Sequence, residues 1–365
     1  MLLDDIALTL ESKVNLKTLA HLMSHFSSAE AIYAAGADEL VARCELKREL
    51  AESISKKSAH TKALEQLRHI NRHKITALRP EDENYPRLLG EIPDPAHVLY
   101  LMGDSSILNS RMVTMVGTRD ITSYGHRMCD RLVKELSEID SNIVIVSGLA
   151  YGIDAECHRA ALRYGLRTVA VVKDILPEVS PKGNELLASE ILSSGGCILS
   201  ESNIFTHFYK SEYKRRNRIM AAMSMATVVV ESKDKSGANS TAFLARDYNR
   251  EVFAVPGRID EKSSEGTNNL IKSSHAQILT SAMDLALELG WDCESTTLKN
   301  AEVQEVELSE VQAKIMELIP AGAVVYSDFI SQNSGINQGD LMAEMFELEL
   351  SGLVRTLPGG RYERV

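Results

Sequence analysis

Short apolar runs alternate with stretches of helical periodicity between about residue 110 and residue 290. The runs are rich in β-branched residues and lie at 112–116, 143–146, 168–172, 197–199, 227–230, 252–255 and 277–279. Continuous apolar runs separated by amphipathic helices are typical of a parallel sheet that is buried on both faces. Such strand–helix–strand units are right-handed, and their ligands bind at the carboxyl ends of the strands. The pattern therefore predicts a doubly wound α/β domain.

The segment before this domain is helical in character. Residues 1–78 contain no proline, and apolar residues recur at helical spacing, for example at Leu16, Leu19 and Met23. Ser27 or Ser28 is a suitable N-cap for a helix that carries Glu30 in its first turn. Prolines at 80, 86, 93 and 95 then predict a loop-rich entry to the α/β domain over residues 80–104.

The segment after the α/β domain has two parts. Residues 292–307 are acidic and polar without an obvious period, as in a linker. Residues 308–365 show helical spacing around Ile315, Phe329 and 341–350, followed by a short hairpin with a Pro-Gly-Gly turn at 358–360. Three helices and a hairpin predict a winged-helix domain. We therefore divide the chain into a helical domain (1–78), an α/β core (79–291), a linker (292–307) and a winged-helix domain (308–365).

Composition places the chain among ordinary globular proteins. It has 365 residues, 44% of them hydrophobic and 25% charged, and it needs no disulfides or metal to stabilise a core. Its five cysteines lie far apart and form no CxxC pair, which favours reduced thiols in a cytoplasmic protein. We expect no signal peptide and no membrane-spanning segment, because no sufficiently long apolar run is present.

The charged residues become informative when they are counted segment by segment. The net charge of −11 argues against a polybasic coat for nucleic acid or membranes. However, residues 41–79 contain ten Lys or Arg and only four Glu, and residues 207–218 contain five Lys or Arg and only one Glu. A solvated helical face is the favoured interpretation of the first segment, and a DNA contact is the alternative. In the second segment, aromatic residues interleave with the cations, and this combination favours a nucleic-acid strand over a plain solvated surface.

Several predicted strands end in loops that suit an anion. The first ends in Gly117-Thr118-Arg119, and the second continues as Ser147-Gly148-Leu-Ala150-Tyr-Gly152. Glycines let the backbone approach a ligand, and the amides at the following helix N-terminus attract phosphate. Neither loop matches a Walker A or a GxGxxG fingerprint. After the fifth strand, Lys235-Ser236-Gly237 opens another helix. Because these loops open on one rim of a doubly wound fold, their convergence predicts a binding surface.

We find no catalytic, metal or cofactor constellation in the sequence, and we expect none. Asp154, His158 and Glu201 are the only candidates for acid–base chemistry, and for the first two capping and helix packing are favoured over catalysis. His69 and His73 lie one helical turn apart without a carboxylate or thiol pattern, which favours a surface pair over metal ligands.

The order of these motifs resembles that of the DprA family, also called Smf. The segments that carry the likeness are YPRLLGEIPDPAHVLYLMG, MVGTRDITSYG, SGLAYGIDAECHRAAL, RRNRIMAAMS, VVES with KSG, REVFAVPGR and SEGTNNLIKSSHA. The resemblance covers residues 84–290 strongly and both flanks weakly. It implies an extended Rossmann-like core, an N-terminal helix-hairpin-helix or SAM-like domain and a C-terminal winged-helix domain. It also implies a cytoplasmic, non-enzymatic homodimer that binds single-stranded DNA, protects incoming DNA and loads the RecA recombinase during natural transformation.

The resemblance also implies which residues contact single-stranded DNA. Carried over by position, they are Gly117, Thr118, Arg119, Ser147, Gly148, Ala150, Gly152, Tyr213, Arg216, Asn217, Arg218, Lys235, Ser236 and Gly237. Among them, Arg119 and Arg218 are expected to contact phosphate. The chain departs from the family pattern at Tyr213-Lys214, where Phe-Pro is usual, and in the loop 173–181, which lacks two glycines, an Asp and a Tyr.

Two other functions remain open from the residues alone. The same fold and glycine-rich strand ends are found in enzymes that act on nucleotides or phosphosugars. A winged-helix domain is also typical of transcription regulators, although residues 337–350 carry no Lys or Arg to contact a duplex.

Overall fold

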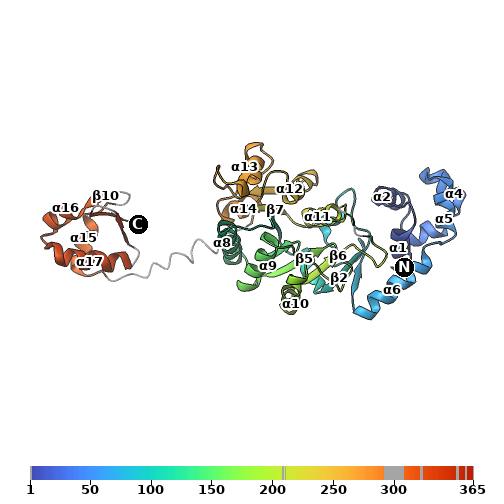
Figure 1. Ribbon diagram of the computed structural model, residues 1–365, viewed down its shortest axis with the longest axis horizontal. Helices are drawn as coiled ribbons and strands as arrows, with labels where there is room; N and C mark the ends of the chain where they lie inside the picture. The colour runs from blue at the N-terminus through green and yellow to red at the C-terminus, as the bar shows by residue number, and fades with distance from the viewer. Residues whose placement is uncertain are drawn as a thin grey trace. The chain divides into compact units, whose positions relative to one another are not determined.

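A computed structural model describes residues 2–207, 209, 211–291, 308–320, 324–350, 353–357 and 360–364 (Figure 1). The chain divides into two compact units, Met1–Cys293 and Glu294–Val365. The predicted linker 292–307 and the first part of the Pro-Gly-Gly turn lie outside the described residues. No helix in the described ranges is long and apolar enough to cross a membrane. Four of the cysteines are buried free thiols: Cys44, Cys129, Cys157 and Cys197.

Six helices make up the N-terminal segment, as its apolar spacing predicts. They are α1 (Leu2–Leu10), α2 (Leu16–His25), α3 (Ala29–Ala34), α4 (Ala37–Cys44), α5 (Arg48–Ser55) and α6 (His60–His73). Asn15 caps α2 by accepting from the Thr18 amide at 3.0 Å. Ser28 caps α3 by accepting from the Ala31 amide at 3.1 Å, so the second of the two predicted caps is the one used.

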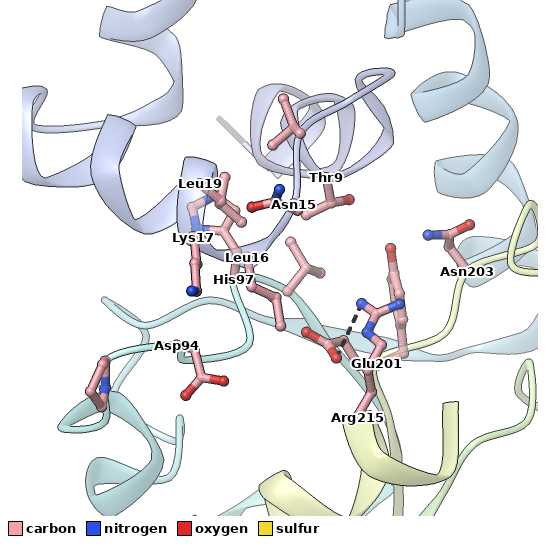
Figure 2. Close-up of a pocket in the computed structure, with 14 residues that line it drawn as sticks. Thr9, Asn15, Leu16, Lys17, Leu19, Asp94, His97, Glu201, Asn203 and Arg215 are labelled. Atoms are coloured by element: carbon pink, nitrogen blue, oxygen red, sulfur yellow. Dashed lines mark ion pairs between the residues drawn. The ribbon is translucent and has the colours of Figure 1, made fainter. Parts of the chain in front are cut away.

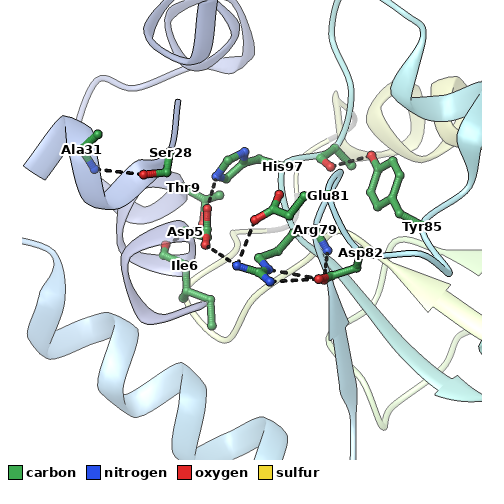
Figure 3. Close-up of polar contacts among 11 residues, drawn as sticks. Asp5, Ile6, Thr9, Ser28, Ala31, Arg79, Glu81, Asp82, Tyr85 and His97 are labelled. Atoms are coloured by element: carbon green, nitrogen blue, oxygen red, sulfur yellow. Dashed lines mark hydrogen bonds and ion pairs between the residues drawn. The ribbon is translucent and has the colours of Figure 1, made fainter. Parts of the chain in front are cut away.

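These helices pack directly against the α/β core. Apolar side chains of the helices share one buried cluster with residues of three strands, including Tyr100 and Val172. A buried ionic contact also joins the two segments (Figure 3). Asp5 accepts from His97 Nε2 at 2.9 Å and pairs with Arg79 at 3.4 Å. Residues 1–78 and 79–291 therefore belong to one compact unit, and the boundary between them at residue 78 stays a prediction.

The core is a nine-stranded sheet with the order β1-β2-β6-β5-β4-β3-β7-β8-β9. The strands are β1 (Thr76–Leu78), β2 (Leu99–Gly103), β3 (Met112–Gly117), β4 (Val144–Ser147), β5 (Arg167–Val172), β6 (Cys197–Ser200), β7 (Ala226–Glu231), β8 (Glu251–Ala254) and β9 (Gln277–Ile278). Pairing is parallel from β6 through β9. All seven predicted strands are present, and the predicted doubly wound α/β fold is confirmed.

Helices cover both faces of this sheet (Figure 1). They are α7 (Arg87–Gly90), α8 (Ser123–Ile139), α9 (Ile153–Arg163), α10 (Glu185–Ser193), α11 (Ser211–Met223), α12 (Gly237–Asp247), α13 (Glu265–Lys272) and α14 (Ala282–Glu288), with short 3₁₀ turns at Ser105–Asn109, Lys182–Asn184 and Lys262–Ser264. Buried residues of α8, α9 and α14 share one apolar cluster, and those of α11, α12 and α13 share another. Burial on both faces explains why the strands are continuously apolar.

The proline-rich entry segment is more ordered than its composition predicts. β2 lies within residues 80–104 and pairs antiparallel with β6, with Leu101 opposite Leu199. β1 adds to the edge by pairing antiparallel with β2. The expectation of a loop-rich segment was therefore wrong for residues 99–103, because tertiary pairing outweighs the nearby prolines.

The C-terminal unit has the predicted winged-helix architecture. It contains α15 (Glu310–Glu317), β10 (Val324–Tyr326), α16 (Ser327–Ser334), α17 (Gln338–Leu350), β11 (Val354–Leu357) and β12 (Arg361–Arg364). The hairpin strands β11 and β12 pair antiparallel, and β10 pairs with β12. Its own core includes Ile315, Ile330, Leu341, Met345 and Tyr362.

Candidate nucleic-acid interface

The strand order fixes where a ligand site is expected. The chain runs from β3 through β4, β5 and β6 on one side, then returns to β7, which pairs with β3 on the other side. This reversal is the switch point of a doubly wound sheet, where ligands bind beyond the carboxyl ends of the strands. The loops after β3 and β7 flank that point, and the loop after β4 lies on the next strand.

The first loop is held in place by a buried carboxylate. The Thr118 amide donates to the Glu231 carbonyl at 2.7 Å. The side chain of Glu231 accepts from the Thr122 hydroxyl at 2.7 Å and from its amide at 3.1 Å. Thr122 in turn caps α8 by accepting from the Gly125 amide. Sequence reasoning did not single out Glu231 as a loop-positioning residue, because its partners lie more than 100 positions away.

The second loop packs tightly on the first. Gly152 has a φ of +80°, and a Cβ there would overlap the Thr118 carbonyl. The Ile153 amide donates to that same carbonyl at 3.1 Å. Ser147 is buried and donates to the Met115 carbonyl at 2.6 Å. Gly152 and Ser147 therefore shape the loop; they line neither of the two cavities described below, and their contact with DNA stays a prediction.

Gly148 has a different reason to be glycine. A Cβ at this position would overlap Nη1 of Arg216 and come within 2.7 Å of the Asp154 carboxylate. Arg216 is 8% exposed, and its Nη1 lies 3.7 Å from Asp154 Oδ2. Burial lowers the pKa of Arg216 and raises the pKa of Asp154, while each partner opposes the other's shift. The result is a buried cation beneath the second loop, neutralised by one carboxylate.

An exposed aromatic ring lies beside this cation. Tyr213, in the first turn of α11, is 36% exposed. The Arg119 guanidinium lies 5.3 Å from the ring centroid, and Lys173 Nζ lies 5.5 Å from it. Cations at this distance from a ring interact with its π face. Asn217, on the same helix, donates weakly to the Gly237 carbonyl at 3.5 Å.

The β7 loop completes the surface. Ser236 caps α12 by accepting from the Asn239 amide. Lys233 Nζ pairs with Asp120 at 2.7 Å and thereby connects the loops after β7 and β3. Lys235 has a φ of +55° and lines a separate hollow between α12 and α13. Lys235 lines neither of the two cavities described next, and its contact with DNA stays a prediction.

These elements enclose two adjoining cavities of about 230 and 290 Å³, which we call the rim cavities. Both are lined by Arg119, Ala150, Tyr213 and Arg216. The smaller also includes Gly148, Tyr151 and Lys173, and the larger includes Gly117, Thr118, Asn217, Ser236 and Gly237. Ten of the sequence-predicted site residues therefore meet at one surface, and Tyr151, Lys173 and Lys233 join them.

Comparison with known proteins identifies the family of this chain. Residues 76–290 match the model of DNA recombination-mediator protein A, and residues 299–360 match the DprA winged helix domain. The chain belongs to the DNA recombination-mediator protein A family. Protein Smf of Synechocystis is 32% identical over 79% of this chain and 79% of its own.

Two solved structures of the family resemble this chain. DNA processing protein A from Streptococcus pneumoniae has a TM-score of 0.58 and 29% identity, covering 76% of this chain and 98% of its own. The protein from Helicobacter pylori, whose structure describes a unique single-stranded DNA binding mode, has a TM-score of 0.52 and 31% identity. That match covers 59% of this chain and 95% of its own.

The family resemblance implies that Arg218 contacts phosphate, but in this chain Arg218 lies outside the rim cavities. It is 4% exposed and pairs with Glu201 at 2.7 Å and with Asp94 at 3.6 Å. It lines neither rim cavity. A contact between Arg218 and DNA stays a prediction that would require these ion pairs to open.

Hydrogen bonds and an ion pair hold the loop after β5, which departs from the family pattern. The Asp174 carboxylate accepts from the Ser180 amide at 3.1 Å and from the Ser180 hydroxyl at 2.8 Å. Lys173 Nζ lies 2.9 Å from the same carboxylate, and His69 Nε2 lies 2.7 Å from the Leu176 carbonyl. The loop therefore contributes Lys173 and Ser180 to the smaller rim cavity without the family's usual glycines.

The three candidates for acid–base chemistry are all engaged in packing or ion pairs. His158 is fully buried against the Thr168 hydroxyl at 2.7 Å, and burial lowers its pKa to about 3. Asp154 faces Arg216, and Glu201 lies between Arg215 and Arg218. Within the described part of the chain, no group of three or more His, Cys, Asp or Glu is placed to hold a metal ion.

A larger cavity of about 760 Å³ lies between the N-terminal helices and the core (Figure 2). Lys17 and Asn15 reach it from the helices, while Asp94, Glu201 and Arg215 reach it from the core. Glu201 and Arg215 pair with each other at 3.2 Å. Because opposite charges largely cancel there, size alone does not make this cavity the ligand site.

Proposed function

We propose that this chain binds single-stranded DNA at the rim cavities and acts as a recombination mediator without catalytic activity. The observation that carries the proposal is the joint lining of both cavities by an exposed cation (Arg119), a buried cation (Arg216) and a partly exposed ring (Tyr213). Cations suit the phosphates of a strand, and rings stack on its bases.

The surface suits a single strand better than a duplex. A ring that stacks on bases needs bases that are unpaired, and the cavities are too small to receive a double helix. In this account Arg119 contacts phosphate, Tyr213 stacks on a base, and the guanidinium of Arg216, which lines both cavities, offers N–H donors to the strand. Backbone amides around Gly117 and Gly237 add donors for a second phosphate.

An enzyme acting on nucleotides or phosphosugars is the alternative that shares this fold. The packing of His158, Asp154 and Glu201 counts against it, because a general base must reach its substrate. Incubating the chain with nucleoside monophosphates and assaying base release tests this alternative. Base release at a rate that falls in an Asp154→Asn variant would favour the enzyme.

The wider role in the proposal is to protect incoming single strands and load RecA on them, as a homodimer in the cytoplasm. It rests on family membership and on the DNA-binding surface. A mobility-shift experiment that compares single-stranded with duplex DNA, with and without RecA, tests it. We expect a shift with the single strand and a further slow species on adding RecA. A RecA filament that forms equally fast without this chain would contradict the loading role.

A further inference from the structure

The helix α6 joins the N-terminal segment to the loops at the carboxyl edge of the sheet. His69 Nε2 lies 2.7 Å from the carbonyl of Leu176, in the loop after β5. The side-chain carbonyl of Gln66 accepts from the amide of Ile204, in the loop after β6, at 2.9 Å. Because β3, β4, β5 and β6 are parallel, these two loops leave the sheet at the same edge as the loops of the rim cavities.

The loop after β5 contacts both α6 and the smaller rim cavity. Lys173, Ser180 and Pro181 line that cavity, whereas Leu176 contacts α6. Ser180 follows Leu176 by four positions, so the two residues are at most about 14 Å apart. A stacked strand advances about 3.4 Å per phosphate, so about four nucleotides cover this distance. A strand that leaves the smaller cavity over this loop therefore reaches α6.

One face of α6, which we call the loop face, carries Lys62, Gln66, His69 and His73. These residues are spaced by three or four positions, so they share one side of the helix. The rings of His69 and His73 lie 4.6 Å apart between centroids. Lys62 Nζ lies 5.7 Å from the centroid of the Phe205 ring, in the loop after β6. Lys62 is also exposed, so its charge is open to a ligand beside this loop.

Two arginines border the loop face on its solvent side. Neighbouring residues of a helix point about 100° apart, so residues that follow the loop-face positions lie to one side of it and residues that precede them lie to the other. Ala63 and Ile70 follow such positions and are buried. Arg68, Arg72 and Glu65 precede such positions and are exposed. The exposed border therefore carries two cations and one carboxylate.

The cations of α6 differ from other cations of the N-terminal segment in having no carboxylate partner. On α4 and α5, Arg43 pairs with Glu39 and Lys56 pairs with Glu52. Within the described part of the chain, the lysine and the two arginines of α6 form no such ion pair. The unpaired positive charge therefore lies on the helix that borders the rim loops. Unpaired exposed cations favour phosphate, because their contact with a strand releases its counterions.

We propose that α6 extends the path of the single strand beyond the rim cavities. The strand continues over the loop after β5, and its phosphates contact Lys62 and Arg72. These two residues are ten positions apart, or about 15 Å along the helix axis, so they meet phosphates about four positions apart. The inference rests on the proposed function and deepens it, because it gives the N-terminal helices a share of the affinity for DNA.

The test measures anisotropy of labelled single strands of about four and about 20 nucleotides with the full chain over a salt series. The double variant Lys62→Ala/Arg72→Ala should bind the long strand roughly threefold to tenfold more weakly than the wild type. Its slope of log affinity against log salt should be lower by about 1.4, because two phosphate contacts are lost. It should bind the short strand normally, because the rim cavities are intact. Arg43→Ala/Lys56→Ala removes the same residue types from paired positions and should bind both strands normally.

Three results would overturn the proposal. Equal affinity and equal slope of the α6 variant and the wild type on the long strand would show that α6 does not contact DNA. An equal deficit on both strands would mean that the variant disturbs the rim cavities and extends no path. An equal loss in the control variant would assign the effect to overall charge. In each case the wild type still binds single strands, so the proposed function stands, whereas a wild type that binds neither strand would contradict the proposed function itself.

Discussion

The guanidinium of Arg216 occupies the space that a side chain on Gly148 would fill. The two residues are far apart in sequence: Gly148 lies in the loop after β4 and Arg216 lies in α11. The missing Cβ of Gly148 leaves room for the Arg216 guanidinium. Asp154, 3.7 Å from Arg216, balances that charge. Together they place a neutralised buried cation directly under the rim cavities.

Replacing Gly148 with Ala tests this relationship. The methyl group must displace the Arg216 guanidinium, and overpacking of this kind typically costs about 1–3 kcal/mol of folding free energy. Loss of one charge-assisted contact should weaken single-stranded DNA binding roughly tenfold. Urea unfolding and fluorescence anisotropy measure the two effects. Gly36→Ala is the control, because nothing lies within 4 Å of a Cβ there. If Gly148→Ala binds DNA as tightly as the wild type, Arg216 does not contribute to DNA binding.

Arg119 and Arg218 should behave differently when each is changed to Ala. Arg119 is exposed, so its loss should leave stability unchanged and lower the slope of log affinity against log salt by about 0.7. Arg218 is buried between Glu201 and Asp94, so its loss should cost roughly 3 kcal/mol of stability. Salt titrations and urea unfolding separate the two. A stable Arg218→Ala variant with a reduced slope of log affinity against log salt would instead show that Arg218 contacts phosphate.

Tyr213 should act through its ring. Tyr213→Phe keeps the ring and should bind normally, whereas Tyr213→Ala should lose about 1–3 kcal/mol of binding free energy. The comparison is made by anisotropy with one single-stranded oligonucleotide. Phe243→Ala is the matched control, because Phe243 is also exposed but lines neither rim cavity. Equal losses in the Phe and Ala variants would point to the hydroxyl instead.

His158 gives the chain a pH-dependent stability. Burial, with help from Arg159 and Arg216, lowers its pKa from 6.5 to about 3. Above pH 6.5 the imidazole is neutral in both the folded and unfolded chain, so the full stability is present. Below pH 6.5 only the unfolded chain takes up the proton. His158 should then cost about 1.4 kcal/mol of stability for each pH unit down to about pH 3.

Urea unfolding of the wild type and His158→Gln at pH 6.5, 5.5 and 4.5 measures this dependence. The difference between the two should shrink or reverse as the pH falls, because Gln does not titrate. His207→Gln, at an exposed position, should follow the wild type. A difference that stays constant with pH would mean that His158 titrates alike in both states.

Much of the fold was predictable because its signals are local. The runs at 112–116 and 168–172 are continuously apolar because helices cover both faces of the sheet, and Thr122 and Ser28 cap helices as their residue types suggest. β2 was missed because its pairing with β6 is a long-range contact and the nearby prolines point to a loop.

The site was predictable in outline and not in detail. Strand ends identified Gly117, Gly148 and Ser236, but not the contact of Glu231 with Thr122 or the pairing of Asp154 with Arg216, because both contacts span the fold. Arg216 and Arg218 were grouped as adjacent members of one motif. In a helix, residues two positions apart do not face the same side, so α11 turns one toward the rim and the other toward Glu201. Helical periodicity could have separated them.

The central claim is that a single strand binds at the rim cavities. The most direct test is anisotropy with a single-stranded oligonucleotide and its duplex over a salt series, for the wild type and for Arg119→Ala/Tyr213→Ala. We predict tighter binding of the single strand than of the duplex by the wild type. We also predict a large loss of affinity and a shallower salt slope in the double variant, whose stability is unchanged. Equal affinity and equal slope for the wild type and the variant would contradict the account.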